Sequence, residues 1–536
     1  MFVKNNENDI FIENVISRNT GYPAEAFLKV VPEPFIHNIK EGCDLLKTNM
    51  DKTIHVIGDY DVDGIFGTAI MELGLKKAGF RVTSRLPLRF SEGYGLSEKI
   101  IDEIDSGIIV TVDNGIAAGR AIEKAKKKGL IVIVTDHHLA PVDENGNIVL
   151  PAADIVIDPT IDEKSEYHDY CGAAVAYRFV KELLGKDNMQ LKVLASIATV
   201  ADVMELTPVN HQLVKEGLKL INAGRCVPAL KEILKQIELT DHITEIDYGF
   251  QLGPIINASS RLYDDGAAKV LKIVETGDRD FRLPWKVKYV VDNNTKRKAI
   301  MKEDLKRVNE ALALKGADKP IVVYDPEIGE GIIGLIAGRL CENYQCPVIV
   351  FTDCDNGCLK GSGRSIPSIH LKNVLDKIKD EMVGYGGHAG AAGLTIKKEN
   401  LSSFKSRFKD ACGTIPPVST DTTYDLELQG TDIAEAIERL KLYAPYGNGN
   451  ARIRFLITGC KISDYRVIGD GDSFMAQCEL FHLTITGFGL REKYELLGSP
   501  SKLDCIGYLE ESWFKGKMSY KLELADFRTS FTNVIS

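Results

Sequence analysis

The chain has 536 residues, of which 44% are hydrophobic and 26% are charged. This composition is typical of folded globular domains and excludes a mainly disordered chain. At roughly 150 residues per domain, the length predicts about three or four domains. The formal net charge is −10, which disfavours a protein that coats nucleic acid indiscriminately, because such proteins are usually basic overall. An acidic balance does not exclude a nucleic-acid enzyme, which can gather carboxylates at a metal site and keep its basic groups in a local groove.

Cysteine usage and hydropathy indicate the compartment. The 11 cysteines are scattered without paired spacing, and the first residues, MFVKNNENDIFIENVIS, contain no apolar signal core. No run approaches the roughly 20 apolar residues that a membrane-spanning helix needs. We therefore expect a reduced, soluble, cytoplasmic protein with no membrane partner.

Short β-branched runs alternate with helical stretches between residues 53 and 159. The runs are TIHVIGD, GIIVTVD, LIVIVTD and ADIVIDP. Continuous apolar runs of this length predict strands buried on both faces of a parallel sheet that is covered by helices. They end at or just before Asp59, Asp113, Asp136 and Asp158. In an open α/β sheet the carboxyl ends of the strands gather along one ligand-binding edge, so we expect the chemistry there.

Further regions follow this α/β unit. Residues 171–275 read as mostly helical, and the charged segment 286–314 predicts a helical connector between two lobes. Residues 320–414 predict a second α/β unit, with HLKNVLDKIKDEM as one of its helices. After residue 417, one helix and several short strand-like runs predict a small β-barrel.

The most informative motif is GDYDVDG, which directly follows a predicted strand and precedes a predicted helix. Asp59, Asp61 and Asp63 alternate, so an extended segment would place all three on one face. Three carboxylates that close repel one another unless cations lie between them, and an oxygen-rich site favours Mg²⁺ or Mn²⁺. A plain polar turn is the alternative. An EF-hand-like loop would need a glutamate where the chain has Ile70.

Three more motifs supply polar groups at the ends of predicted elements. In TDHH, the adjacent His137 and His138 can place one imidazole on a metal and the other beside a substrate, although two exposed loop histidines are the alternative. Asp113 closes another strand, in the position of a bridging ligand. Asp202 ends an apolar helix, where a simple helix-end group is the alternative. Together these residues form a set suited to two metals, and mixed imidazole and carboxylate ligands favour Mn²⁺ over Mg²⁺.

The motifs DYDVDG, VDNG, DHH and the VAD aspartate resemble the DHH phosphoesterase superfamily in their order and spacing. In the second α/β unit, GSGRSIPSIHL and GGHAGAAG resemble the companion DHHA1 domain. Further segments narrow the resemblance to the RecJ family of bacterial single-stranded-DNA-specific exonucleases: RFSEGYGL, CGAAVAY, GPIINASSRL and LYAPYGNGNARIRF. The resemblance covers nearly the whole chain between residues 52 and 455.

This resemblance implies a fold class and a set of domains. The fold would be α/β, with a DHH parallel-sheet lobe and a DHHA1 lobe joined by a helical connector, followed by a C-terminal oligonucleotide-binding (OB)-like β-barrel. The ranges that we expect are an N-terminal segment at 1–50, the DHH catalytic domain at 51–225, the helical region and connector at 226–315, the DHHA1 domain at 316–415 and the OB-like nucleic-acid-binding domain at 416–536.

The resemblance also implies roles for the acidic and imidazole groups. Asp61 and Asp113 would hold one ion, with Asp59 beside them as a ligand. The second ion would be held by Asp63, Asp113, His137 and Asp202, so that Asp113 bridges the two. His138 would contact the scissile phosphate or the leaving oxygen, which makes Asp113 and His138 the catalytic residues. The cofactor would be two ions of Mn²⁺ or Mg²⁺, a pair that activates water for in-line phosphodiester hydrolysis.

Substrate contacts are implied in both lobes. Ser362 and Arg364 of GSGRS, and His388 of GGHAGAAG, offer contacts to phosphate. Gly386 and Gly387 let backbone N–H groups approach an anion without interference from a Cβ atom. A tight turn is the alternative for the glycine-rich stretch taken alone.

Three residues of the first lobe and helical region match family positions expected to grip the strand or its 5′ end: Arg89, Tyr94 and Arg261. Tyr94 could stack on a base, with plain packing as the alternative. The chain departs from the family pattern at Ile255, where a basic residue is common, and at Ser260, where glycine is common. These departures concern the grip on the substrate rather than the reaction.

The predicted function is a metal-dependent 5′→3′ exonuclease that degrades single-stranded DNA to 5′-mononucleotides, in DNA repair and recombination. A single-stranded-DNA-binding protein and a helicase are partners implied only by the family. One alternative is a DHH phosphodiesterase for small substrates such as short oligonucleotides, cyclic dinucleotides or pyrophosphate, whose members typically lack the APYGNGN segment and the barrel. Another is a non-catalytic DNA-binding scaffold, but such chains usually lose metal ligands that this chain keeps.

Overall fold

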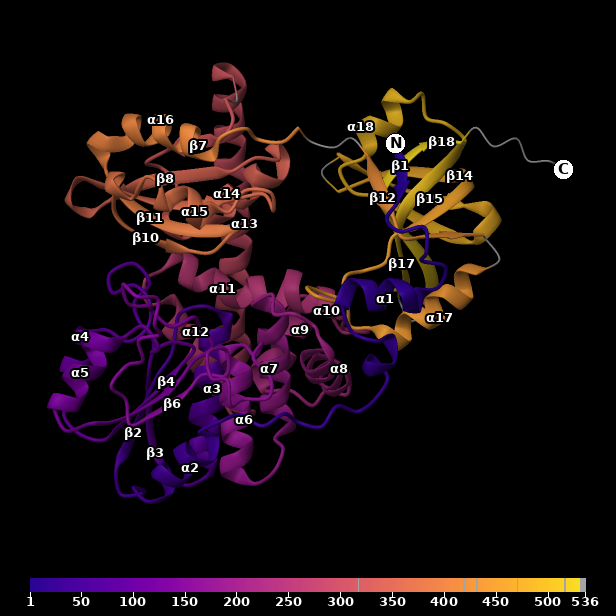
Figure 1. Cartoon of the computed structure of the whole chain (residues 1–536). Helices are drawn as coiled ribbons and strands as arrows, with labels where there is room; N and C mark the ends of the chain where they lie inside the picture. Colours follow the sequence, from indigo (N-terminus) through magenta and orange to yellow (C-terminus); the bar gives the residue numbers. More distant parts are fainter. Residues whose placement is uncertain (317, 418–420, 430–431, 470, 515–516, 531–536) are drawn as a thin grey trace.

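The computed structural model describes residues 1–536 except 317, 418–420, 430–431, 470, 515–516 and 531–536. Figure 1 shows two lobes stacked at the left of the view and a β-barrel at the right. The helices between them, and one long helix that reaches both lobes, hold the parts together. Within the described residues, no helix is both long enough and apolar enough to cross a lipid bilayer.

The first lobe is built on a five-stranded parallel sheet with the order β3-β2-β4-β5-β6. Its strands are β2 (Thr53–Ile57), β3 (Arg81–Arg85), β4 (Ile108–Val112), β5 (Ile131–Thr135) and β6 (Ile155–Ile157). The strand β4 is buried at every position, as expected for a central strand covered on both faces. The structure confirms the parallel α/β prediction, and it places β2, β4 and β5 side by side, so their carboxyl ends meet.

Helices cover both faces of this sheet. They are α2 (Ile39–Lys47), α3 (Val62–Lys77), α4 (Glu98–Asp102), α5 (Gly119–Lys127), α6 (Gly172–Leu184) and α7 (Met189–Ala201). The helix α3 has apolar residues around its whole circumference and is almost entirely buried, because it lies between the sheet and the helices α6, α7 and α12 (Gly266–Val274). Its first turn therefore has a fixed position at the carboxyl edge of the sheet.

A helical region continues from α7 and leads to the second lobe. It contains α8 (Pro208–Asn222), α9 (Pro228–Gln236), α10 (Glu245–Asp247), a π-helical turn (Tyr248–Leu252), α11 (Gly253–Leu262), α12 (Gly266–Val274) and α13 (Leu283–Lys315). The long helix α13 packs against α9, α11 and α12 and then against α14 (Glu330–Tyr344) of the second lobe. The predicted charged connector is therefore one continuous helix.

The second lobe has a five-stranded mixed sheet with the order β10-β11-β9-β8-β7. Its strands are β7 (Ile321–Tyr324), β8 (Val348–Cys354), β9 (Cys358–Arg364), β10 (Met382–Gly387) and β11 (Ala391–Lys397), and its helices are α14 (Glu330–Tyr344), α15 (Leu371–Asp376) and α16 (Leu401–Cys412). The prediction of one helix through HLKNVLDKIKDEM is wrong at its C-terminal half. The helix α15 ends at Asp376, and Met382 already begins the edge strand β10, because pairing with β11 outweighs local helix propensity.

The C-terminal domain is the predicted barrel. Its strands are β13 (Leu426–Leu428), β14 (Phe455–Ile468), β15 (Ser473–Cys478), β16 (Leu483–Gly487), β17 (Lys502–Phe514) and β18 (Lys517–Thr529), accompanied by α17 (Ile433–Tyr443) and α18 (Arg491–Leu496). Pairing of β14 with both β15 and β17 closes five of these strands into a ring.

The first residues of the chain fold onto this C-terminal barrel. The strand β1 (Phe2–Lys4) pairs in parallel with β12 (Thr422–Tyr424), and α1 (Ile12–Thr20) packs against α17. The apolar side chains of α1 and of the 3-10 turn Ala24–Phe27 share one buried cluster with the barrel. In Figure 1 the indigo N-terminal segment accordingly lies among the yellow strands. The sequence pattern predicted no partner for this segment.

Candidate metal centre

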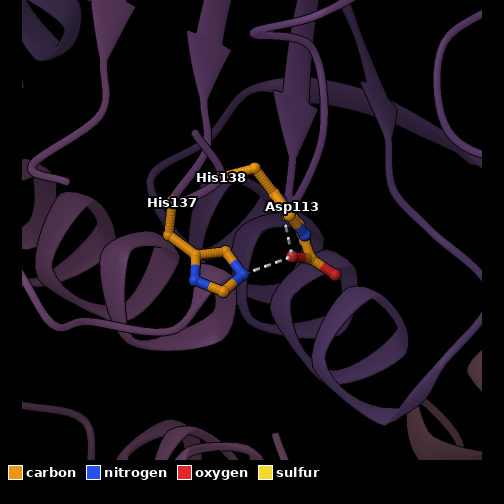
Figure 2. A group of neighbouring side chains, drawn as sticks. All are labelled: Asp113, His137 and His138. Carbon is orange, nitrogen blue, oxygen red and sulfur yellow. Dashed lines mark ion pairs between the residues drawn. The ribbon is translucent and has the colours of Figure 1, made fainter. Parts of the chain in front are cut away.

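The carboxyl ends of three neighbouring strands bring the first polar groups together. Asp59 follows β2, Asp113 follows β4, and His137 follows β5. Asp59 and Asp113 are buried, with 1% and 2% of their surface exposed. Figure 2 shows Asp113, His137 and His138 gathered at this edge of the sheet. The location that the sequence predicted for the chemistry is therefore where these side chains meet.

Asp61 and Asp63 reach this edge by a different route from the one expected. They do not lie on an extended face: Asp61 is the N-cap of α3, and its Oδ1 accepts the backbone N–H groups of Asp63 at 3.0 Å and Gly64 at 3.1 Å. The chain folds back so tightly here that a Cβ atom on Gly64 would lie 2.6 Å from the carbonyl oxygen of Asp59. The helix cap, rather than strand alternation, brings the three aspartates together.

The start of α6 fixes Asp63. The backbone N–H groups of Gly172 and Ala173 donate to its Oδ2 and Oδ1 at 2.7 and 2.8 Å. These are the first residues of α6, where unpaired N–H groups and the helix dipole favour a negative charge. Both oxygens of Asp63 are therefore oriented by a helix more than a hundred residues away in the sequence.

Asp113 occupies the middle of the cluster in a left-handed backbone conformation, with a φ of +63°. Its Oδ1 is buried and accepts no hydrogen bond from the described residues. His137 Nε2 lies 3.0 Å from this Oδ1, 3.6 Å from Asp63 Oδ2 and 3.8 Å from Asp202 Oδ2. One imidazole nitrogen thus faces the carboxylate after β4, which Figure 2 shows, and also those of α3 and of the end of α7.

The electrostatics of the cluster are unfavourable in the chain alone. Burial, and then the charge of neighbouring aspartates, raises the pKa values of Asp59, Asp113 and Asp202 well above the ordinary value. Burial also disfavours the charged form of His137. It therefore lowers the pKa of this histidine and keeps its imidazole neutral. A neutral imidazole is the form that binds a metal, and cations between the carboxylates would remove their mutual repulsion.

Three sets of side chains present ligand atoms within 4.8 Å of one another. They are Asp59 with Asp61 and Asp113, Asp63 with His137 and Asp202, and Asp113 with His137 and His138. The first two sets contain all six residues that the sequence predicted as metal ligands, and Asp113 Oδ1 lies 3.0 Å from His137 Nε2 of the second set. Carboxylate oxygens with one imidazole form a donor set that fits Mn²⁺ or Mg²⁺.

His138 is oriented by Asp136, a residue that the sequence analysis did not include in the site. His138 Nδ1 lies 2.8 Å from Asp136 Oδ1, and the backbone N–H of Ile116 donates to Asp136 Oδ2 at 2.9 Å. Burial alone would lower the pKa of His138, but the hydrogen bond and charge of Asp136 outweigh it and raise this pKa to about 9. The sequence contained a signal for including Asp136 in the site, because this residue ends a buried strand as Asp59 and Asp113 do.

Tyr94 lies in the metal centre rather than at a distance from it. Its hydroxyl donates to the backbone carbonyl oxygen of Asp113 at 2.6 Å and lies 3.1 Å from His138 Nδ1. Its ring remains half exposed. The hydroxyl therefore helps to hold the left-handed turn at Asp113, and the exposed ring is available to a ligand.

A group of arginines lies beside the aspartates, at the junction of the two lobes. Arg261 lies in the last turn of α11 and donates from Nη1 to the carbonyl oxygen of Gly331 in the second lobe at 3.2 Å. Burial, followed by the charges of Arg89 and Arg297, lowers the pKa of Arg261 to about 9, and Arg364 adds to this effect. These guanidinium groups are therefore close enough to repel one another.

None of these four arginines is neutralised by the chain. Within the described residues, no carboxylate lies within 4.0 Å of Arg89, Arg261, Arg297 or Arg364. A cavity of about 160 Å³ adjoins Arg261 and Arg297. Arg297, on α13, is a member that the sequence analysis had described only as part of a charged run. An unneutralised, enclosed pair of arginines is suited to binding an anion.

The remaining predicted contacts lie on the sheet of the second lobe. Ser362 and Arg364 are on β9, and Arg364 Nη1 lies 3.4 Å from Ser362 Oγ. Gly386 and Gly387 end the edge strand β10, and His388 follows in the hairpin to β11. The side chain of His388 is exposed and has no hydrogen bond or ion pair within the described part of the chain. The structure therefore joins Arg364 to the arginine group, but it does not join His388 to it.

Models of three known domain families match three regions of the chain. The model of the DHH family, N-terminal domain, matches residues 53–204, the DHHA1 domain model matches residues 318–414, and the RecJ OB domain model matches residues 424–526. The matched regions correspond to the first lobe, the second lobe and the barrel.

Three similar proteins each carry the name single-stranded-DNA-specific exonuclease RecJ. The Haemophilus influenzae protein is 30% identical over 92% of this chain and 88% of its own length. The Thermus thermophilus protein is 31% identical over 92% of this chain and 71% of its own length. The Salmonella typhimurium protein is 34% identical over 66% of this chain, and the match spans 65% of that relative's length.

Two solved structures have the same arrangement of domains. The crystal structure of Thermus thermophilus RecJ in complex with Mn²⁺ has a TM-score of 0.79 and 26% identity, and it covers 97% of this chain and 76% of its own. The Mg²⁺ complex of the same protein has a TM-score of 0.73 and 25% identity, with coverage of 97% and 74%. The likeness extends from the first lobe to the barrel.

Proposed function

Because this chain belongs to the RecJ family of single-stranded-DNA-specific exonucleases, we propose that it degrades single-stranded DNA from the 5′ end and releases 5′-mononucleotides. The observation that carries the proposal is the convergence of two ligand sets on Asp113, whose buried Oδ1 accepts no hydrogen bond in the described chain although His137 Nε2 lies 3.0 Å away. A buried carboxylate oxygen without a donor is costly unless a cation completes it. The reaction would be hydrolysis of a phosphodiester bond.

The cofactor would be two ions of Mn²⁺ or Mg²⁺. Asp59, Asp61 and Asp113 would hold one of them, and Asp63, His137 and Asp202 would hold the other together with Asp113. When bound, such a pair lowers the pKa of water and offsets the charge that develops on the phosphate. The family's structures with Mn²⁺ and with Mg²⁺ support this choice of ions.

The chain's own contribution to the chemistry would come from His138. Its imidazole is held by Asp136 and is more exposed than that of His137. With a pKa of about 9 it carries a proton at neutral pH. We assign it to donate a hydrogen bond to the scissile phosphate or to the leaving oxygen. Tyr94 would keep His138 and Asp113 in register through its hydroxyl.

The arginines would hold the 5′-terminal part of the strand. Arg89, Arg261 and Arg364 offer planar guanidinium groups that match phosphate oxygens, and Ser362 adds a hydroxyl beside Arg364. We assign Gly386, Gly387 and His388 to contacts with the strand farther from the metal centre, since they lie on the edge strand of the second lobe and its hairpin. The OB domain would bind single-stranded DNA that extends beyond the two lobes.

The same reaction defines the proteins with which this one would work. A single-strand-specific exonuclease needs strands that have been separated, so a helicase and a single-stranded-DNA-binding protein are the expected partners. Its place of action would be the bacterial cytoplasm, in DNA repair and recombination, because the chromosome lies there.

The test uses a single-stranded DNA labelled at its 3′ end and long enough to reach from the lobes to the barrel. We expect a ladder of 3′-labelled products that shorten from the 5′ side with Mn²⁺, and no products with EDTA or with a duplex of the same sequence. An uncut strand would contradict the proposal. Cleavage of dinucleotides alone would favour the small-substrate phosphodiesterase, and cleavage of neither would favour the scaffold.

A further inference from the structure

The C-terminal domain docks on the chain segment that directly follows Asp202. The backbone N–H of Leu206 donates to the carbonyl oxygen of Asn448 at 2.7 Å, and the Nδ2 of Asn448 donates to the carbonyl oxygen of Val203 at 2.9 Å. The approach is close, since a Cβ atom on Gly447 would lie 2.9 Å from Leu206 Cδ1. Asn448 is therefore hydrogen-bonded to both ends of the segment Val203–Leu206, which follows Asp202.

This segment begins with a backbone conformation that is costly for its residue. Val203 has a φ of +59°, in the left-handed region that β-branched residues rarely occupy. Its N–H donates to Val200, and the N–H of Met204 donates to Thr199, which is the hydrogen-bond pattern of a Schellman motif at the end of α7. Glycine is the usual residue at this position. The side chain of Val203 is 66% exposed, so packing of that side chain does not impose the turn.

The turn matters because, among the described residues, no hydrogen bond to its side chain orients Asp202. Asp63 accepts two N–H groups from the start of α6, and Asp61 accepts two from its own helix. The carboxylate of Asp202 accepts no hydrogen bond within the described part of the chain, and its Oδ2 lies 3.8 Å from His137 Nε2. Its position in the ligand set therefore follows from the backbone at the end of α7.

We propose that Asn448 is a positioning residue of the metal centre. By holding Val203 in the left-handed turn, the C-terminal domain sets the place of Asp202 beside Asp63 and His137. The inference rests on the proposed function only in taking this ligand set to bind Mn²⁺ or Mg²⁺. It follows that the C-terminal domain acts on the chemistry, and not only on the grip on DNA.

The first experiment titrates Mn²⁺ into the full chain without DNA, by calorimetry, for the wild type and for Asn448→Ala. Outer partners of metal ligands typically change metal affinity by about 10–100-fold, and we expect Asn448→Ala to weaken Mn²⁺ binding on the order of tenfold. With saturating Mn²⁺, kcat on single-stranded DNA should fall while KM for DNA stays unchanged. The matched control is Lys215→Ala, which removes a contact between the same domains, from Nζ to Leu442 O, without touching the segment. It should leave Mn²⁺ affinity unchanged.

The second experiment is a rescue. Glycine adopts the left-handed conformation without a Cβ penalty, so adding Val203→Gly to Asn448→Ala should restore most of the Mn²⁺ affinity. A purely structural loss of the domain contact would not be repaired in this way. Unchanged Mn²⁺ affinity in Asn448→Ala, or a loss that Val203→Gly does not restore, would overturn the proposal. If Asn448→Ala does not fold, Gly447→Ala replaces it, because it displaces the same loop from Leu206.

The two proposals fail separately. A wild type that binds Mn²⁺ but cuts no DNA would contradict the proposed function and leave the titration as a test of Asn448. A wild type that cuts DNA, with an Asn448→Ala variant that binds Mn²⁺ normally, would contradict only the positioning role.

Discussion

The metal centre differs from the buried pair Glu72 and Glu275, behind α3, in whether the chain itself neutralises the negative charge. Glu72 on α3 and Glu275 just after α12 are both largely buried. Lys76 pairs with Glu72, and Lys272 Nζ lies 3.0 Å from Glu275 Oε2 and 3.7 Å from Glu72 Oε2. Here the chain neutralises its own carboxyl groups.

The metal centre has no such compensation. Within the described residues, no lysine or arginine lies within 4.0 Å of the aspartates of the two ligand sets, although four arginines lie at the same junction of the lobes. The arginines are equally without carboxylates. Because the arginines and the aspartates lie near one another without forming ion pairs, both groups remain available to ligands of the opposite charge. The difference supports the proposal that cations and phosphates, rather than the chain, complete this region.

The largest effect should come from removing the central carboxylate of the metal centre, which no basic side chain of the described chain neutralises. Asp113→Ala deletes the group shared by both ligand sets, so single-turnover cleavage should fall by at least on the order of a thousandfold. Binding of single-stranded DNA, measured by fluorescence anisotropy, should change little, because the arginines remain. Asp44→Ala, at an exposed position of α2 far from the site, is the control. Substantial cleavage by Asp113→Ala would refute the two-metal assignment.

An intermediate effect should come from removing one of the four arginines beside the metal centre. Arg364→Ala removes a half-buried guanidinium that bonds only to Ser362 and Gly363 next to it in the described structure. Losing a charged hydrogen bond costs about 1.5–3 kcal/mol, which corresponds to roughly 10–100-fold weaker DNA binding. The salt dependence of DNA binding should also become less steep. Lys372→Ala tests a partly exposed cation of the same lobe that is already paired with Asp376, and it should have almost no effect. Equal losses in both variants would argue against a phosphate site at Arg364.

The smallest effect concerns the self-neutralised pair. Burial and the neighbouring Glu72 raise the pKa of Glu275 to about 8. An acid whose pKa is higher when folded stabilises the fold below its unfolded pKa, about 4.3, and this stabilisation is lost as the pH rises toward the folded value. Glu275→Gln has no proton to lose, so its melting temperature should exceed that of the wild type more at pH 9 than at pH 6.

This variant also sharpens the comparison between the two regions. Glu275→Gln should leave Mn²⁺ affinity and DNA cleavage as they are, because the pair lies behind α3 rather than at the junction of the lobes. A melting difference that does not change with pH would show that the pKa of Glu275 is not raised in the folded protein.

The sequence by itself determined four of the five strands of the first lobe, their parallel pairing and the identity of the candidate ligands. Period and composition predict a buried parallel sheet, and such sheets place strand ends on one edge, so Asp59, Asp113 and His137 could be brought together without coordinates. The helix-ending position of Asp202 was equally visible, as were the connector helix and the barrel. These features depend on local patterns of a few residues.

Only the tertiary structure decided how those ligands are held. The cap that turns Asp61 and Asp63 inward, the N–H groups of α6 on Asp63, and the grip of Asn448 on the turn after Asp202 join residues distant in the sequence or depend on exact backbone angles. The same is true of the pairing between β1 and β12 and of the edge strand that shortened α15. Local propensity carries no information about partners hundreds of residues away, because those contacts are selected by packing and hydrogen bonding in the assembled fold.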